Sequence, residues 1–187
     1  MRLFVAVTPP EDARADLAAA LGGVRELLVG ARPVRPAQWH LTLAFLDDVA
    51  AGTVDAVRAA ASVAAASADP FALALAGAGT FGRDRAVVWI GLSGAVDRLD
   101  RLARVLRGGL VAAGLPLDSR SFTPHLTVGR NVDLRRPAVA AALGRLTGYS
   151  GPQWKVEQLQ LVRSTLGTGP GGGACHEPLD AWPLGRP

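Results

Sequence analysis

Hydrophobic and polar positions along this chain recur at the spacings of short strands and amphipathic helices. Apolar residues dominate residues 3–7, and this run predicts a first strand. A proline pair and two acidic residues follow, a combination that favours the start of a helix. Leu17, Leu21, Val24 and Leu28 are then spaced by four, three and four residues, which predicts one apolar helix face.

The rest of the chain also alternates between hydrophobic patterns typical of strands and of amphipathic helices. We expect further strands at residues 39–46, 71–78, 86–92, 122–130 and 154–163, and further helices at residues 50–66 and 137–146. Ser93 is placed to cap another helix, whose leucines recur on one face at positions 99, 102, 106 and 110. The glycine-rich residues 167–173 predict a flexible loop before the tail.

The order of these elements repeats once. A strand, a helix and a strand bearing His-Leu-Thr-Leu occupy residues 3–43, and the same order ending in His-Leu-Thr-Val occupies residues 86–128. His40 and His125 are 85 positions apart, and shifting Val5 by 85 reaches Ile90, inside the corresponding strand. The repeat predicts an α+β fold of two similar lobes, with both motif strands lining one central groove.

Composition narrows the classes of protein. With 187 residues, 49% hydrophobic and 19% charged, the chain is not an intrinsically disordered tail and fits one globular domain. The formal net charge of +4 is compatible with a nucleic-acid partner. It is equally compatible with codon bias, because Lys155 is the one lysine among arginines. Charge alone leaves both interpretations open.

Cysteine usage and apolar runs exclude several other classes. A lone cysteine, Cys175, excludes an intrachain disulfide framework and a cysteine-based zinc cluster. The run at residues 3–7 is too short for a signal peptide. The alanine-rich residues 59–79 are interrupted by Pro70 and polar residues, short of the roughly 20 apolar residues of a membrane span. We therefore expect a soluble, cytoplasmic protein without a membrane partner.

The two histidine motifs carry the candidate chemistry. Side chains alternate along a strand, so His40 and Thr42 share one face, as do His125 and Thr127. A single such histidine is usually a core residue satisfied by a neighbouring carbonyl. Two matched copies in a repeated topology instead favour a functional site.

Three kinds of chemistry could use histidines and threonines in this arrangement. A metal site is disfavoured because threonine is a poor ligand and two histidines leave zinc or iron short of protein ligands. Serine-type acyl transfer is disfavoured because no nucleophile-elbow pattern is present. Two imidazoles suit in-line phosphodiester cleavage, in which one removes a proton from the attacking oxygen and the other protonates the leaving oxygen. Hydroxyls and arginines can stabilise the charge on the remaining phosphate oxygens.

The paired tetrapeptides, about 85 residues apart, resemble the two-histidine (2H) phosphoesterase superfamily, and more closely its bacterial RNA 2′,3′-cyclic phosphodiesterase branch, historically called 2′-5′ RNA ligases. The resemblance extends over almost the whole chain. Residues 2–7 resemble the branch's opening strand, residues 39–46 and 123–130 its two motifs, and residues 161–166 its last strand.

The resemblance implies a fold and an activity. The implied fold is bilobal, with two antiparallel sheets related by a pseudo-twofold axis, so that residues 1–187 form one domain of two intertwined lobes. The implied reaction opens the terminal 2′,3′-cyclic phosphate of RNA to leave a 2′-phosphate, without a metal or cofactor. Some members also reversibly join tRNA halves through a 2′-5′ linkage.

The resemblance also implies roles for individual residues. His40 would be the proton donor to the departing 3′-oxygen, and His125 the base that activates water. Thr42 and Thr127 would hydrogen-bond the phosphate. Arg130 matches an arginine that follows the second motif and contacts the phosphate, although strand parity directs it away from the second histidine unless the preceding glycine bends the strand.

Other positions are weaker candidates or departures from the family pattern. Arg120 and Arg163 are weaker candidates for phosphate contact, and Phe4 suits either the terminal base or the core. Two aspartates at residues 47–48 replace a glycine common in the family. His176 falls where an aromatic residue is common, and we expect it to be a surface residue of the tail.

The motifs are compatible with two other functions. A family enzyme could act on 2′-5′ oligonucleotides or ADP-ribose 1″,2″-cyclic phosphate, because these substrates present the same phosphate geometry. An RNA-binding module without turnover is the alternative outside enzymes, and intact histidines in both motifs count against it. The leading hypothesis is a monomeric enzyme acting on RNA with a 2′,3′-cyclic phosphate end, tRNA halves included.

Overall fold

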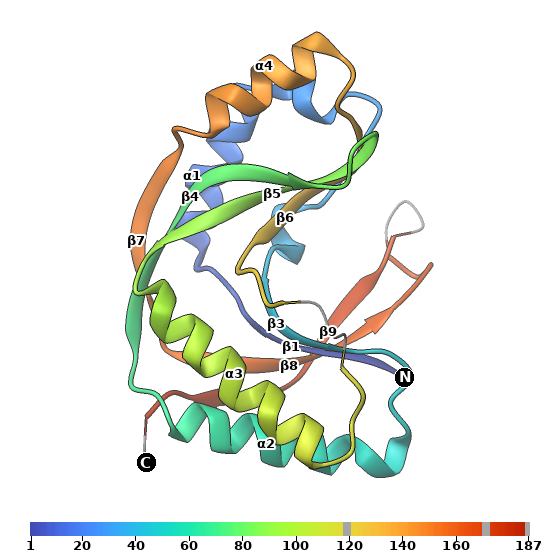
Figure 1. The fold of residues 1–187 in the computed structure, drawn as a ribbon, viewed down its shortest axis with the longest axis vertical. Coiled ribbons are helices and arrows are strands. Elements are labelled where there is room, and N and C mark those ends of the chain that lie inside the picture. The colour runs from blue at the N-terminus through green and yellow to red at the C-terminus, as the bar shows by residue number, and fades with distance from the viewer. Residues whose placement is uncertain (118–120, 170–172, 186–187) are drawn as a thin grey trace.

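The computed structural model describes residues 1–117, 121–169 and 173–185. Its described parts form one antiparallel sheet of nine strands with four α-helices and three short 3₁₀ turns (Figure 1). The strands are β1 (Arg2–Val7), β2 (Arg32–Pro33), β3 (Leu41–Leu46), β4 (Phe71–Phe81), β5 (Arg85–Gly94), β6 (Leu126–Asp133), β7 (Ser150–Val156), β8 (Gln158–Thr165) and β9 (Cys175–Pro183). The helices are α1 (Glu11–Gly22), α2 (Val54–Ala66), α3 (Val96–Ala112) and α4 (Pro137–Leu146), and the turns are η1 (Arg25–Leu28), η2 (Pro36–Gln38) and η3 (Ala51–Thr53).

The sheet consists of two antiparallel halves. The strand order is β7-β4-β5-β6-β3-β1-β8-β9, with β2 paired to β6. We call β7, β4, β5 and β6 the His125 half, and β3, β1, β8 and β9 the His40 half. A single residue pair, Leu41 with Leu126, joins β3 to β6 and so connects the halves. The predicted α+β fold is confirmed, but the two predicted antiparallel sheets are joined by this pair into one curled sheet.

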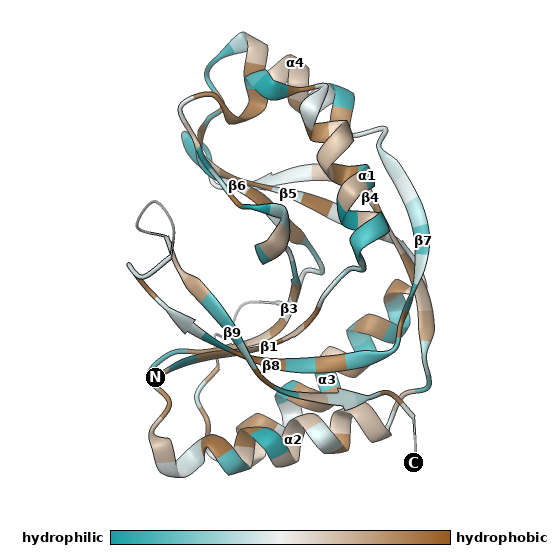
Figure 2. Ribbon diagram, turned by 180° about the vertical axis from the view of Figure 1, so that it is seen from behind, coloured by the Kyte–Doolittle hydropathy of each residue, from teal (hydrophilic) through white to brown (hydrophobic). Residues whose placement is uncertain are grey.

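The helices pass from one half to the other. α1 follows β1 of the His40 half but packs against β7 and β4 of the His125 half, and α3 follows β5 but packs against β3. α2 lies on β8, β9 and α3, while α4 lies beside η1 and β4. Figures 1 and 2 show α1 and α4 on the outside of one half and α2 and α3 on the outside of the other. We call the face that each half turns toward the other its inner face.

The helix α3 shows how the apolar pattern produces the packing. Its four predicted leucines are buried, with at most 1% of each side chain exposed. Figure 2 shows the matching alternation of hydrophobic and hydrophilic segments along α2 and α3. The predicted cap at Ser93 is wrong, because Ser93 pairs with Ala74 in the sheet and the chain turns at Gly94, whose φ is 91°. The described helices are all too short or too polar to cross a membrane.

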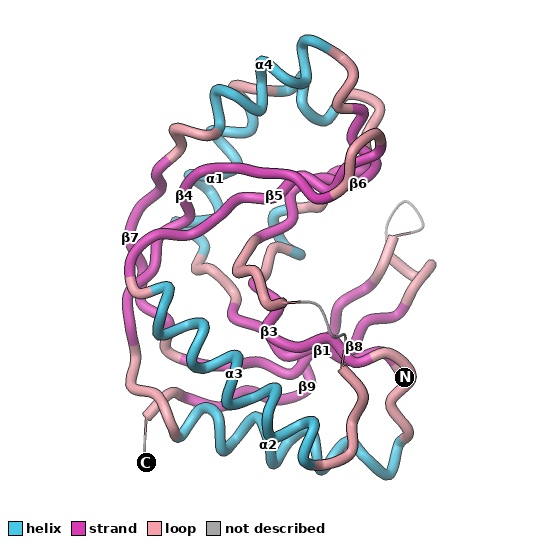
Figure 3. Tube along the Cα trace, viewed as in Figure 1, coloured by secondary structure: helices cyan, strands magenta, loops and turns pink. Residues whose placement is uncertain are grey.

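Several boundaries differ from the sequence prediction (Figure 3). The first helix ends at Gly22, followed by a separate 3₁₀ turn. The single strand predicted at residues 154–163 is two strands, β7 and β8, which belong to different halves. β9 was not predicted; it is an edge strand containing Pro178, a residue that edge strands tolerate. Both motif strands begin one residue after their histidine.

Candidate active site

The Leu41–Leu126 pair brings the two motifs together. Both leucines are buried in the core, with 1% and 0% of the side chain exposed. Because side chains alternate along extended backbone, the residues on either side of each leucine point to the opposite, inner face. Those residues are His40 and Thr42 on one side of the junction, and His125 and Thr127 on the other, all half-buried. One residue pair therefore places all four motif side chains on a shared face.

Each histidine ring is held in the same way. His40 Nδ1 lies 2.7 Å from the carbonyl oxygen of Gln38, and His125 Nδ1 lies 2.7 Å from that of Thr123, in both cases two residues upstream. A carbonyl oxygen can only accept, so Nδ1 carries the hydrogen in both rings. The second nitrogen, Nε2, is then the one available for proton transfer.

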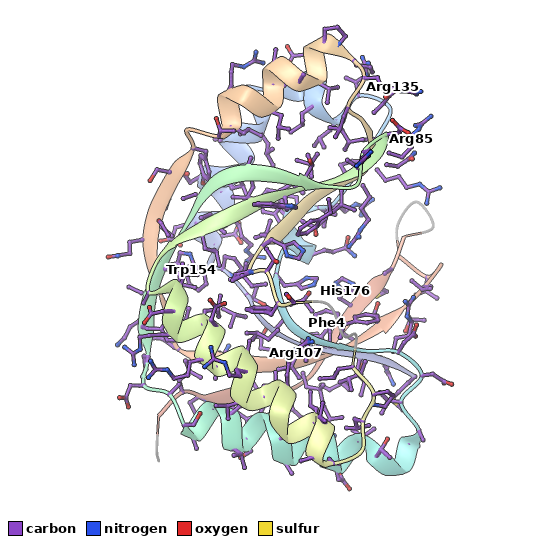
Figure 4. The ribbon with its side chains drawn as sticks, viewed as in Figure 1. Phe4, Arg85, Arg107, Arg135, Trp154 and His176 are labelled. Atoms are coloured by element: carbon purple, nitrogen blue, oxygen red, sulfur yellow. The ribbon has the colours of Figure 1, made fainter. Side chains whose placement is uncertain are left out.

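Aromatic side chains pack around His40. The Phe4 ring is stacked on it, with centroids 4.5 Å apart and an angle of 19°. The His176 ring stands edge-on to both, at 5.3 Å from His40 and 5.0 Å from Phe4. Figure 4 shows Phe4 and His176 close together between the two halves. The prediction that His176 is a surface tail residue is wrong, because β9 pairs with β8 and carries it to the site.

A different pair of aromatic rings packs around His125. The Phe81 ring meets it edge-on at 4.9 Å, and the Trp89 ring is tilted at 6.3 Å. Phe81 and Trp89 also contact each other at 5.4 Å. Sequence reasoning did not select either residue, since both look like ordinary apolar residues of a strand.

Gln38 is a further residue that the motifs did not reveal. Its carbonyl oxygen accepts from His40, and its side-chain Nε2 donates to the carbonyl oxygen of Ala174 at 2.6 Å. Ala174 is two residues before His176. Gln38 therefore fixes the His40 ring and the start of β9 relative to each other.

Burial and positive charge lower the pKa of all three histidines. Burial lowers the pKa of His40 to about 4; the hydrogen bond to Gln38 opposes this shift, and the charges of His176, Arg130 and His125 add to it. The pKa of His125 is lowered by burial, against its own carbonyl hydrogen bond, and by Arg130. Burial and Arg130 also lower the pKa of His176.

Arg130 follows Gly129 on β6, and its positive charge contributes to the lowered pKa of all three histidines. Regular alternation of side chains along β6 would direct Arg130 away from His125. The pairing of β6 with β5 is irregular on both sides of Gly129, however, so the alternation is interrupted there. A Cβ atom at Gly129 would lie 2.5 Å from Leu28 Cδ2, so only glycine fits this position without a shift. Irregular register of this kind bends a strand and can change the direction of the side chain that follows.

The structure describes only one of the two arginines that were weaker candidates for phosphate contact. Arg163 Nε donates to Glu177 Oε2 at 3.1 Å across β8 and β9, so its charge is already paired. Arg120 lies outside the described residues. Of the aspartates that replace the family glycine, Asp47 forms an ion pair with Arg2 at 3.0 Å.

The described residues offer no group of three or more histidine, cysteine or acidic side chains that could hold a metal ion. Cys175 is exposed and next to His176. The polar groups gathered on the inner face are instead proton-transfer groups, hydroxyls and a guanidinium. That set suits an anionic substrate whose bonds break by proton transfer.

Comparison with known proteins agrees with this geometry. Residues 8–168 match the family model of the 2′-5′ RNA ligase superfamily. The chain is 32% identical over 183 residues to an RNA 2′,3′-cyclic phosphodiesterase of Geobacillus stearothermophilus, covering 97% of this chain and 56% of that relative's length. It is 36% identical over 173 residues to an RNA 2′,3′-cyclic phosphodiesterase of Thermus thermophilus, covering 89% of this chain and 83% of the relative.

A solved structure shows the same arrangement of elements. Escherichia coli LigT in complex with 3′-AMP superimposes with a TM-score of 0.78 at 28% identity, covering 98% of this chain and 97% of that one. The chain belongs to the 2′-5′ RNA ligase superfamily.

Proposed function

We propose that this protein hydrolyses the 2′,3′-cyclic phosphate at the end of an RNA chain and leaves a 2′-phosphate. The observation that carries the proposal is the pair of imidazoles, each fixed through Nδ1, that the Leu41–Leu126 junction brings to one face. The names of the Geobacillus and Thermus relatives support the substrate class. A binding module would need only phosphate donors and no such pair.

The proposed reaction is one in-line displacement. His125 Nε2 accepts a proton from water while the water oxygen bonds to phosphorus. The bond from phosphorus to the 3′-oxygen breaks, and that oxygen takes a proton from His40 Nε2. The products are a 2′-phosphate and a 3′-hydroxyl, and the two histidines have exchanged protonation states.

Three further residues act on the phosphate in this proposal. Thr42 and Thr127 donate hydrogen bonds to its non-bridging oxygens, where negative charge builds up in the transition state. Arg130 supplies the positive charge for the same oxygens. All three act as preorganised donors, while the histidines move protons.

The low pKa of His40 makes its charging depend on the substrate. In the free protein His40 is neutral at pH 7, because burial lowers its pKa to about 4. A bound phosphate brings negative charge close to the ring and offsets the charge of Arg130, which raises this pKa. The acid is therefore charged when the cyclic phosphate is in place.

A pH dependence follows from the two shifted imidazoles. The free protein is active when the pair holds one proton. Below about pH 4 both rings are protonated and no base remains; above the pKa of His125, itself lowered from 6.5, both are neutral and no acid remains. We expect a bell-shaped profile of kcat/KM with its maximum below pH 6.5, and a kcat profile displaced to higher pH. A kcat/KM maximum above pH 7.5 would contradict these protonation states.

The proposed function is tested by the product. Purified protein is incubated, in the presence of EDTA, with an oligoribonucleotide ending in a 2′,3′-cyclic phosphate, and the position of the product phosphate is determined by ³¹P NMR. We expect a 2′-phosphate and no effect of the chelator. A 3′-phosphate product or loss of activity in EDTA would overturn the mechanism, and RNA binding without product would show a binding module.

The same geometry supports finer proposals about partners. A single chain supplies both motifs, so a monomer is sufficient for the reaction. Halves of tRNA with a cyclic phosphate end are suitable substrates, and a 5′-hydroxyl in place of water would give a 2′-5′ linkage. Product analysis with a second RNA bearing a 5′-hydroxyl distinguishes joining from hydrolysis.

A further inference from the structure

Two arginines stand directly opposite each other on strands beside the second motif. Arg32 of β2 pairs with Arg130 of β6 in an antiparallel register. Both arginines are exposed. Directly opposed residues share a face of the sheet, with Cβ atoms about 4.5–5.5 Å apart. The register of the two strands therefore holds two positive charges next to each other.

The surroundings of Gly129 show which face carries these arginines. Gly129 lies opposite Val88 of β5, which is fully buried. A Cβ atom at Gly129 would also meet Leu28, which packs against the core. Gly129 therefore occupies the core face of β6, and the next residue, Arg130, occupies the opposite, inner face. This is the face that carries Thr127 and the catalytic imidazoles.

The signs of the charges set this pair apart from the rest of the sheet. Among the described strands, two other directly opposed pairs join charged residues, and both combine opposite signs: Arg85 with Asp133, and Arg163 with Glu177. Like charges directly opposite each other destabilise a sheet. The pair of Arg32 and Arg130 is thus unfavourable for the free protein.

No acid in the described part of the chain neutralises the pair. The one acid of β6, Asp133, accepts from Arg135 Nε at 2.9 Å. Neither Arg32 nor Arg130 forms an ion pair with any described residue. A bound anion offsets the repulsion, and the planar guanidinium suits phosphate because it donates two parallel hydrogen bonds to phosphate oxygens.

We propose that Arg32 binds the phosphodiester group on the 5′ side of the terminal nucleotide, beside the cyclic phosphate that Arg130 faces; this rests on the proposed function. The cyclic phosphate is a diester with a single negative charge, so the second arginine requires a second anion. The next phosphate of the RNA is bonded to the 5′-oxygen of the same ribose. Arg130 is three residues beyond Thr127, at most about 10 Å along the strand, so both phosphates are within reach of this face. We call this the 5′ phosphate subsite, and it favours the end of an RNA chain over a mononucleotide.

The test compares three substrates that differ at this one phosphate. Adenosine 2′,3′-cyclic phosphate lacks it, and the dinucleotide ApA with a 2′,3′-cyclic phosphate end contains it. The same dinucleotide with a methylphosphonate linkage keeps the shape without the charge. Arg32→Gln removes the positive charge of the subsite. Arg101→Gln is the matched control, because Arg101 is an exposed arginine of α3 on the outside of the other half.

The effect of Arg32→Gln is expected on the charged dinucleotide alone. There it should lower kcat/KM about tenfold, mainly through KM, while Arg101→Gln stays near wild type. On the other two substrates Arg32→Gln should equal wild type, and wild type should itself lose about tenfold on the methylphosphonate. Equal losses on all three substrates would overturn the subsite, because Arg32 would then act on the cyclic phosphate or on the fold.

Binding and melting give readouts independent of turnover. The dinucleotide with a 2′-phosphate end is titrated by calorimetry at several salt concentrations. The slope of log affinity against log salt should be shallower by about 0.7 in Arg32→Gln than in Arg101→Gln, because one phosphate fewer is neutralised. Relief of the like-charge pair should leave the melting temperature of Arg32→Gln equal to or above that of Arg101→Gln. Equal slopes, or a lower melting temperature, would contradict the proposal.

The binding measurement separates this proposal from the proposed function. If wild type hydrolyses none of the substrates but its affinity for the dinucleotide 2′-phosphate depends on Arg32, the reaction is wrong and the subsite stands. If the substrates are hydrolysed and Arg32→Gln matches Arg101→Gln on each of them, the reaction stands and the subsite is wrong.

Discussion

Replacing His40 or His125 with alanine is expected to lower kcat/KM on a cyclic-phosphate-ended RNA by roughly 10²- to 10⁴-fold each. Each variant loses one of two proton transfers, while the hydroxyls and Arg130 that hold the phosphate remain. Binding of the RNA should therefore largely survive. Single-turnover rates and equilibrium titration with the RNA give the two quantities separately.

A third histidine of the same site provides the comparison. His176 contacts His40 only by an edge-on ring contact at 5.3 Å, and such contacts contribute modestly, so His176→Ala should lower activity by no more than about tenfold. If His40→Ala or His125→Ala stayed within tenfold of wild type, the two-imidazole mechanism would fail. Near-UV circular dichroism shows whether each variant retains its packing.

The duplication and the motifs could be predicted because they are local patterns repeated along the chain. The residue-by-residue pairing of the strands within each repeat could not be predicted. Val7 pairs with Leu41 while Ile90 pairs with Leu126, so the opening strand is shifted by 83 residues and the motif strand by 85. Register irregularities in β1 and β5 account for the difference between the offsets of 83 and 85 residues. These irregularities depend on pairing with strands that are distant in the sequence.

The position of His176 could not be predicted for a related reason. β9 is polar, contains Pro178 and pairs only with β8 among the described strands, so its sequence resembles a tail. Its strand character comes from the partner rather than from its own residues. The contact of His176 with His40 spans most of the chain and has no local signal.

The surroundings of Arg130 show the opposite case, in which the sequence contained a signal for irregular pairing. Alternation alone directs it away from His125, and Gly129 is the feature that allows a departure. The structure shows irregular pairing around this glycine and close packing of Leu28 on its bare face. The alternation of side chains therefore predicts which face a residue occupies only where the strand contains no bulge.

The second large effect is expected with a modified substrate, and it depends on which histidine is the acid and which is the base. In a substrate with sulfur in place of the bridging 3′-oxygen, the leaving group is a thiolate. A thiol has a pKa of about 8.5, far below that of an alcohol, so the thiolate departs without being protonated. Such a substrate makes a general acid unnecessary but still requires a base to activate water.

The most direct test of the account is the rate of each histidine variant on this sulfur substrate relative to the oxygen substrate. His40→Ala is expected to recover roughly 10²-fold or more of its lost activity, because its missing proton is no longer needed. His125→Ala is expected to remain as impaired as before. Recovery of His125→Ala, or of neither variant, would contradict the proposal that His40 donates the proton and His125 accepts it.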